Sequence, residues 1–177
     1  MLSKLRAINI FKRNGKRTYT VPPIPDSVWR NPWHFIAFGF GVGTIPIAPG
    51  TFGTLIAVPF YLFLSTYSNT TYLIITILFT VFSVWLCEKV SREIHIQDHQ
   101  GMCIDEIVGY LVTMLYAPYG WGWIILGFIL FRIFDIWKPW PIRQIDHQMQ
   151  NGFGMILDDT IAGIYSMILI QLLAWII

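Results

Sequence analysis

The segment FRIFDIWKPWPIRQIDHQMQNGFGMILDD, residues 131–159, brings charged side chains into an otherwise apolar part of the chain. Its charged residues are Arg132, Asp135, Lys138, Arg143, Asp146, Asp158 and Asp159. Ionisable groups are costly to hold among aliphatic and aromatic neighbours, so their concentration here predicts a functional site. The sequence on either side of this segment predicts the fold that surrounds the site.

The overall composition is typical of a membrane protein. The chain has 177 residues, enough for one domain, and 55% of them are hydrophobic. Only 12% are charged, compared with roughly 25% in a typical soluble domain. Cys87 and Cys103 stand alone, without the spacing of a disulfide framework or a zinc site. The basic N-terminus is not followed directly by an apolar run with a cleavage site, so we expect no cleaved signal peptide.

The chain divides into a basic N-terminal tail and an apolar domain. Residues 1–32 are rich in Lys, Arg and Pro, which predicts a cytoplasmic tail able to contact anionic lipid headgroups. Nucleic-acid binding is the competing interpretation of this basic patch, but no recognisable nucleic-acid-binding fold supports it. Residues 33–177 are predicted to form a membrane-embedded catalytic domain.

We predict an all-α fold, a polytopic membrane bundle of four to five short transmembrane helices. The apolar runs are residues 54–67, 72–87, 104–117, 121–137 and 160–177. Several of them have only 14–18 residues, whereas about 20 are needed to cross a bilayer, so the helices must continue past the membrane surface. Residues 33–53 are rich in Gly and Pro and predict a re-entrant or broken segment that leads into a helix starting near Thr51.

The distribution of charge predicts the orientation of this bundle. When the runs cross the membrane alternately, every charged residue falls on one side, and residues 66–71, 117–122 and 171–177 on the other side carry none. An excess of Lys and Arg marks the cytoplasmic side. We therefore expect a multi-pass protein of the cytoplasmic (inner) membrane whose active site faces the cytoplasm.

Acidic residues that are far apart in the sequence would meet at this surface. Asp105 and Glu106 begin one predicted helix, Asp158 and Asp159 begin another, and Asp135 lies inside a third. Clustered carboxylates are suitable ligands for Mg²⁺, so we predict that all five are catalytic and bind the metal. Acids at helix starts also cap backbone amides, which is the alternative role for all of them except Asp135.

Basic and glycine-rich elements predict a phosphate site beside the acids. The spacing of Arg132, Asp135 and Lys138 places them on one helical face, where the basic side chains could clamp a phosphate. A ladder of ion pairs is the alternative. Residues 39–54 offer many backbone amides and little side-chain bulk, as an anion-binding loop does. The predicted phosphate-binding residues are Arg132, Lys138, Arg143, Thr51, Gly53 and Thr54.

Four motifs together resemble a known family. They are PGTFGT (49–54), IDEIVGY (104–110), FRIFDIWKPWPIRQID (131–146) and GFGMILDDTIAG (152–163), in this order. With them, residues 33–177 are similar to the phosphatidylglycerophosphatase A family of bacterial membrane enzymes. The resemblance implies a magnesium-dependent phosphatase that removes the terminal phosphate of phosphatidylglycerophosphate, a phospholipid of the bacterial cytoplasmic membrane, and yields phosphatidylglycerol.

Metal-assisted hydrolysis is the predicted mechanism, with either water or an aspartate as the nucleophile. A cysteine phosphatase is excluded because Glu93 and Gly109 stand where it needs an arginine, six residues after each cysteine. A CDP-alcohol phosphotransferase is a second enzyme class, but it needs Asp-x2-Asp-Gly-x2-Ala-Arg, which the sequence around Asp158 does not supply. An ion-carrying membrane protein would distribute its acids through the membrane depth, whereas these collect at one face.

Overall fold

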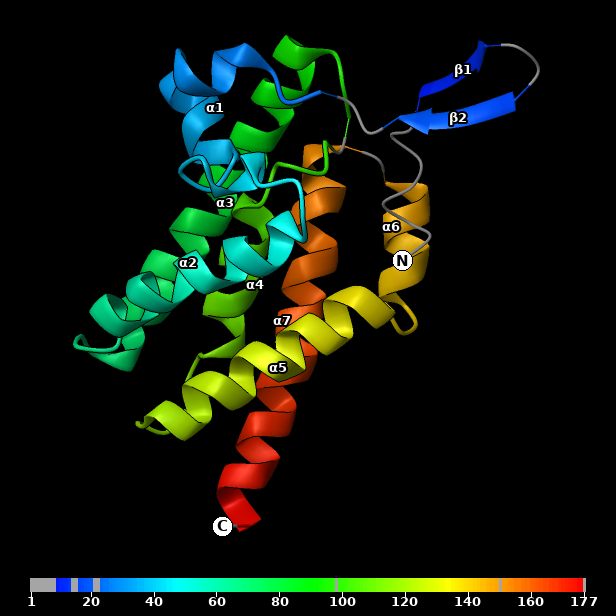
Figure 1. Cartoon of the computed structure of the whole chain (residues 1–177). Coiled ribbons are helices and arrows are strands. Elements are labelled where there is room, and N and C mark those ends of the chain that lie inside the picture. Colours follow the sequence, from blue (N-terminus) through cyan, green and yellow to red (C-terminus); the bar gives the residue numbers. More distant parts are fainter. Residues whose placement is uncertain (1–8, 14–15, 21–22, 98, 150, 177) are drawn as a thin grey trace.

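A short helix, α4 (Ile104–Thr113), lies at the centre of the fold, and all ten of its residues are buried. The computed structural model describes residues 9–13, 16–20, 23–97, 99–149 and 151–176. Around α4 pack α2 (Pro49–Leu64), α3 (Asn69–Ile94), α5 (Trp121–Trp137) and α7 (Gly152–Ile176), as Figure 1 shows. Beyond its first turn α4 is apolar on every side, which is the pattern of a helix enclosed by others.

A broken segment precedes α2, as predicted. It contains one short helix, α1 (Pro32–Ala37), and one 3-10 turn, η3 (Val42–Thr44). A further 3-10 turn, η2 (Asp26–Trp29), lies before it in the predicted tail. The backbone adopts positive φ angles from Gly39 to Gly41, which ends α1 and reverses the chain. α2 then begins at Pro49, so the whole PGTFGT motif lies in its first turns.

Within the N-terminal tail, β1 (Asn9–Arg13) and β2 (Lys16–Thr20) form an antiparallel hairpin, with Asn9 opposite Thr20. This hairpin was not predicted. The signal was the Asn-Gly dipeptide between the two strands, which favours tight hairpin turns, followed by Thr and Tyr, which favour strands. In residues 33–177 the described chain is all-α, as predicted.

Helix α5 covers the predicted residues 121–137, and α3 extends the predicted run 72–87 at both ends. The continuation of α3 carries the expected i,i+4 ion pairs, at 2.8 Å for Arg92–Glu88 and 2.7 Å for Lys89–Glu93.

α2 spans Pro49–Leu64 rather than the predicted 54–67, and the bounds of α4 and α7 differ in ways that matter for the site. α4 ends at Thr113 rather than 117; ten residues rise only about 15 Å, half the thickness of a bilayer core of about 30 Å. α7 begins at Gly152, so the prediction that Asp158 and Asp159 open a helix is wrong. They lie in its second turn. A further short helix, α6 (Ile142–Gln148), occupies the predicted polar connection.

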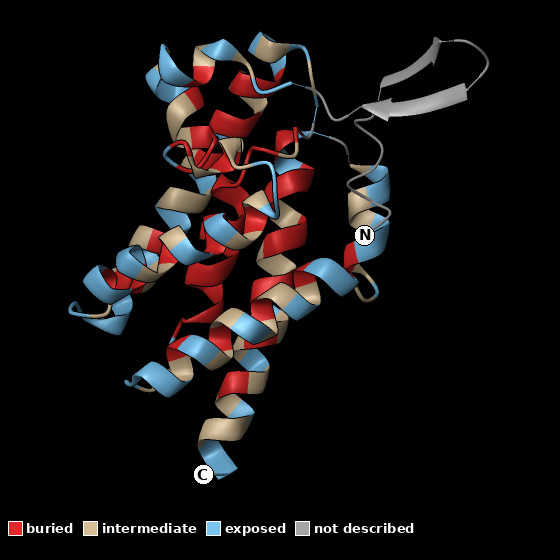
Figure 2. Ribbon diagram, viewed as in Figure 1, coloured by how far each residue is buried: buried red, intermediate tan, exposed pale blue. Residues whose placement is uncertain are grey.

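Two helices, α3 and α7, are long and apolar enough to cross a membrane, and α2 is a shorter apolar helix. Only 28% of the apolar window of each long helix is buried inside the fold. Figure 2 shows that the buried residues concentrate where α4 meets its neighbours, while the far ends of α5 and α7 are largely exposed. The predicted bundle of four to five spanning helices is not confirmed.

Helices α4 and α7 approach each other closely because glycines face each other at the crossing. A Cβ atom at Gly163 would lie 2.4 Å from the carbonyl oxygen of Gly109. A Cβ atom at Gly109 would lie 2.4 Å from the ring of Phe131 and 2.8 Å from the carbonyl oxygen of Asp159. Small residues allow helix backbones to touch, so these two positions set the distance between α4 and α7.

We predict that Gly163→Ala destabilises the protein by about 1–3 kcal/mol, because the added methyl group forces α4 and α7 apart. Thermal unfolding in detergent micelles measures the effect. Gly122→Ala, also in a helix, is the matched control, since nothing lies within 4 Å of its added Cβ atom. Equal stability of the two variants would contradict close packing at this crossing.

Candidate active site

Three buried carboxylates meet where α4 crosses α7. One oxygen each from Asp105, Glu106 and Asp159 lie within 4.8 Å of one another. The side chains come together because Asp105 stands one turn before Gly109 on α4, and Asp159 stands one turn before Gly163 on α7. The contact between the glycines therefore places the acids side by side.

The donor set fits a hard divalent cation. All three groups are carboxylates, which Mg²⁺ and Ca²⁺ prefer, and all three residues are at most 6% exposed. The buried carboxylates of α4, α5 and α7 are Asp105, Glu106, Asp135, Asp158 and Asp159. Two basic side chains lie among these carboxylates, Arg132 on α5 and Lys138 at the end of α5. Five acids therefore face two bases. Burying such an excess of negative charge is costly, and a bound cation would compensate for it.

Arg132 links the acids of α4 to α5. Its Nη1 lies 2.8 Å from Oδ2 of Asp135 and 4.0 Å from Oε1 of Glu106. Its Nε is buried and has no hydrogen-bond acceptor among the described residues. The guanidinium therefore borders the carboxylate cluster and keeps a donor available for an anionic ligand.

The first turn of α2 packs directly on this pair. A Cβ atom at Gly50 would lie 2.1 Å from Oε1 of Glu106 and 3.1 Å from Nη1 of Arg132. A larger residue at this position would press on the carboxylate of Glu106, so glycine lets the first turn of α2 lie directly against this pair. Gly50 is thus a site residue that the sequence reasoning missed, although it lies inside the PGTFGT motif.

The other residues of this motif take different places. Gly53 packs against Cys103, where a Cβ atom would lie 2.8 Å from that of the cysteine. The buried hydroxyl of Thr54 donates to the carbonyl oxygen of Gly50 at 2.9 Å. Thr51 lies in the first turn of α2 and is half-buried. Phosphate binding by Thr51, Gly53 and Thr54 stays a prediction.

Lys138 ends α5 and is buried between two acids. Its ammonium donates to Asp146 at 2.8 Å and also to Asp158. Burial alone would lower the pKa of Lys138, but the charges of Asp158 and Asp159 outweigh it and raise the pKa above its ordinary value. The group is therefore a cation that neutralises Asp158. The sequence assigned no role to Asp146.

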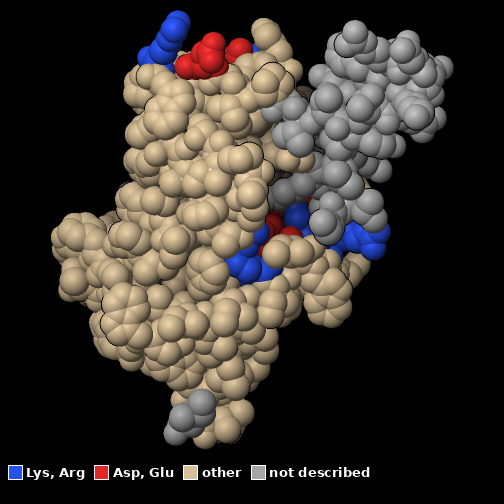
Figure 3. Space-filling view, in the orientation of Figure 1, with Lys and Arg blue, Asp and Glu red and all other residues tan. Residues whose placement is uncertain are grey.

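The predicted site residues thus fall into connected groups. Asp105, Glu106 and Asp159 form the candidate metal cluster, and Asp135 joins it through Arg132. Asp158 is held by Lys138, and Arg143 is exposed on α6. Figure 3 shows basic and acidic atoms together in a hollow of a face that is otherwise largely uncharged. The roles of Asp135 and Asp158 as metal ligands, and of Arg143 and Lys138 as phosphate ligands, stay predictions.

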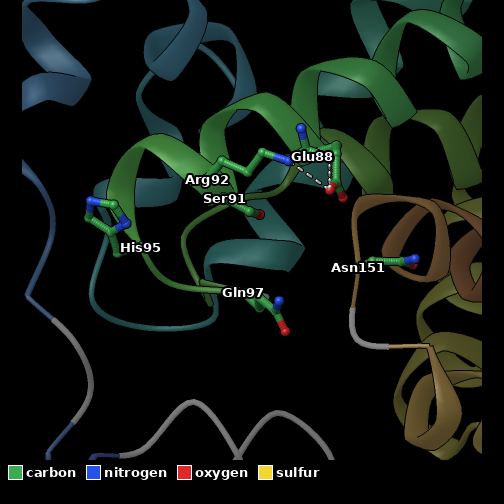
Figure 4. Close-up of a pocket in the computed structure, with 6 residues that line it drawn as sticks. All are labelled: Glu88, Ser91, Arg92, His95, Gln97 and Asn151. Atoms are coloured by element: carbon green, nitrogen blue, oxygen red, sulfur yellow. Dashed lines mark hydrogen bonds and ion pairs between the residues drawn. The ribbon is translucent and has the colours of Figure 1, made fainter.

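Glu88 of α3 fixes where α7 begins. Its Oε2 accepts the amide hydrogen of Gly152 at 3.1 Å, and its Oε1 accepts two hydrogen bonds from Arg92. Oδ1 of Asn151 accepts the amide hydrogen of Gly154 at 2.9 Å. A polar pocket at this junction is drawn in Figure 4, lined by Glu88, Ser91, Arg92, His95, Gln97 and Asn151. These contacts set the register of α7 and hence the position of Asp159.

The family model for phosphatidylglycerophosphatase A matches residues 35–174. This chain belongs to the phosphatidylglycerophosphatase A family. The Escherichia coli (strain K12) phosphatidylglycerophosphatase A is 39% identical over 137 residues, which cover 77% of this chain and 80% of that protein. The protein of the same name from Haemophilus influenzae is 40% identical over 142 residues, which cover 79% of this chain and 87% of that protein. No solved structure matches the chain.

The match to the phosphatidylglycerophosphatase A family contains every residue of the site described above, from Gly50 to Asp159. The β-hairpin lies before it. The charged cluster therefore lies in the part of the chain that matches the family model. The resemblance to this family that the four motifs indicate is confirmed.

We predict that Lys138→Met destabilises the protein by about 3–5 kcal/mol, because it leaves the Asp158 carboxylate buried without its cation. The half-buried Lys89, paired with Glu93, gives the control: Lys89→Met should cost about 0–1 kcal/mol. Thermal unfolding compares the two. A Lys138→Met protein of full stability that has lost activity would show instead that Lys138 serves mainly to bind phosphate.

Proposed function

We propose that this protein hydrolyses the terminal phosphate of phosphatidylglycerophosphate, gives phosphatidylglycerol, and depends on Mg²⁺. The observation that carries the proposal is the cluster of Asp105, Glu106 and Asp159 with Arg132 at its edge. Acids for a cation and a base for an anion, side by side, are what a metal-assisted phosphatase needs. Membership in a family of phosphatases, together with the names of both relatives, supports this reaction and this substrate.

Asp105, Glu106 and Asp159 are the residues that would hold magnesium. When bound, the ion supplies positive charge to the phosphate and lowers the pKa of a water molecule. Asp135 holds Arg132 in place through the contact of 2.8 Å. The Nε donor of Arg132 would bind a phosphate oxygen and stabilise the negative charge that develops there in the transition state.

The reaction exchanges one P–O bond for another. The oxygen of water attacks phosphorus, and the bond between phosphorus and the terminal glycerol oxygen breaks. The departing oxygen takes up a proton, which leaves the free hydroxyl of phosphatidylglycerol, and inorganic phosphate is released. A carboxylate beside Arg132 would accept the proton of the attacking water.

The protein is proposed to act as a multi-pass protein of the bacterial cytoplasmic membrane. α3 and α7 supply two helices of sufficient length, and most of their apolar residues are not buried inside the fold. Exposed isoleucines and aromatic residues on α2 and α5 would face lipid as well. Because Lys and Arg are concentrated on the side that holds the site, that side is assigned to the cytoplasm.

We predict that Asp105→Asn and Asp159→Asn each lower the rate of phosphate release by about 100-fold or more, because each removes a metal ligand. The assay uses purified protein with phosphatidylglycerophosphate in mixed micelles, with and without Mg²⁺. Asp26→Asn, at an exposed acid outside the site, should keep the wild-type rate.

Phosphatidic acid and CDP-diacylglycerol in the same assay test the alternatives. The proposal predicts the highest kcat/KM for phosphatidylglycerophosphate and no transfer to or from a cytidine nucleotide. Full activity of Asp105→Asn and Asp159→Asn, or activity that persists after chelation of all divalent ions, would contradict it.

A further inference from the structure

An apolar groove runs along the outer side of α5 and ends at a charged residue of the site. It is lined by Phe128, Ile129, Arg132, Ile133, Ile136 and Trp137. These residues occupy one face of the helix, because they recur at intervals of three and four. From Phe128 to Ile136 the helix rises about 12 Å. Ile129, Ile133 and Ile136 are each about half exposed.

Arg132 belongs both to this groove and to the candidate active site. Its side chain is 14% exposed, and its Nη1 reaches inward to Asp135 at 2.8 Å. Apart from Arg132 the lining is apolar. A ligand that lies in the groove therefore meets one polar group, and that group borders the carboxylate cluster.

Trp137 connects the groove to a second cavity of about 540 Å³ at the corner between α5 and α6. The second cavity is lined by Trp137, Lys138, Pro139, Trp140, Arg143, Gln144 and His147. Arg143 is exposed there, and the ring of Trp140 is 73% exposed. The apolar groove thus adjoins, at Trp137, a pocket that contains basic and aromatic side chains.

We propose that this surface is where the lipid substrate docks: an acyl chain lies along α5 in the groove, and the headgroup enters beside Trp137 toward Arg132. The inference rests on the proposed function and assigns the substrate an access route between α5 and α6. The occupant is a diacyl lipid phosphomonoester. Its apolar chain matches the isoleucines, and its anionic headgroup matches Arg132 and Arg143.

The charge of Arg132, and the continuity of the groove with the basic pocket, favour a lipid over a second protein helix at this position. A protein helix packed on Ile129 and Ile133 would cover Arg132 on the side from which an anion must approach. A lipid brings both the apolar chain and the anion on the same molecule. The groove and the basic pocket then serve one ligand.

Photo-crosslinking tests this placement without catalysis. The probe is phosphatidic acid with a diazirine in the middle of one acyl chain, and the control is the matched diacylglycerol, both in micelles with the purified full-length protein. We expect the phosphomonoester to label residues 128–137 about tenfold more than diacylglycerol does. Equal labelling by the two lipids, or labelling confined to α2, α3 and α7, would overturn the proposal.

Groove-filling variants test the consequence for turnover. Ile129→Trp and Ile133→Trp should lower kcat/KM for a long-chain phosphatidylglycerophosphate about tenfold, mainly through KM, because the larger indole occupies the part of the groove that the acyl chain would fill. A water-soluble substrate with the same headgroup and no acyl chains should be hydrolysed at the wild-type rate. Ile77→Trp, at an isoleucine of similar exposure on α3, is the matched control and should change neither.

The outcomes separate this inference from the function on which it rests. Wild-type protein that releases no phosphate from any substrate defeats the proposed function, and the crosslinking result then decides the groove alone. Equal losses on the long-chain and soluble substrates, or no loss on either with either variant, would overturn the acyl-chain groove and leave the phosphatase assignment intact.

Discussion

The close contact between α4 and α7 is the constraint on which the rest of the structure depends. Because Gly109 and Gly163 have no side chains, the two backbones touch at this point, and the acids one turn earlier on each helix share one small volume. α4 is buried on all sides, although its first turn carries two carboxylates, because α2, α3, α5 and α7 pack around it. A wider crossing would separate Asp105 from Asp159 and leave no common site.

Ion pairs with basic side chains neutralise part of the buried negative charge around this crossing. Arg132 and Lys138 each face carboxylates at the end of α5, so part of the buried negative charge is neutralised by the chain itself. Asp105, Glu106 and Asp159 are grouped at the α4–α7 crossing, where their oxygens could serve as ligands of a divalent cation. Lys138 therefore neutralises Asp158, and Arg132 borders the candidate metal cluster. A phosphomonoester headgroup, which is itself anionic, needs such a cation to approach these acids.

Sequence reasoning identified the acids, the family and the extent of α5, because charged residues in apolar surroundings and a run of apolar residues are local signals. It misplaced the start of α7, since Asn151 and Gly152 resemble a loop, and one of the hydrogen bonds that begin the helix at Gly152 is accepted by the distant Glu88. The pairing of Lys138 with Asp146 was equally invisible, because the chain reverses after Lys138, whose φ is +45°. Gly50 was overlooked in favour of Gly53 because spacing alone does not show which glycine faces Glu106.

The central claim is that Asp105, Glu106 and Asp159 together bind a divalent cation. Anomalous diffraction from crystals of the full chain grown with Mn²⁺, a substitute for Mg²⁺ that can be located directly, tests it most simply. The account predicts an anomalous peak among these three carboxylates, and its loss in crystals of Asp159→Asn. A peak bound elsewhere, with these side chains unchanged and without an ion between them, would contradict it.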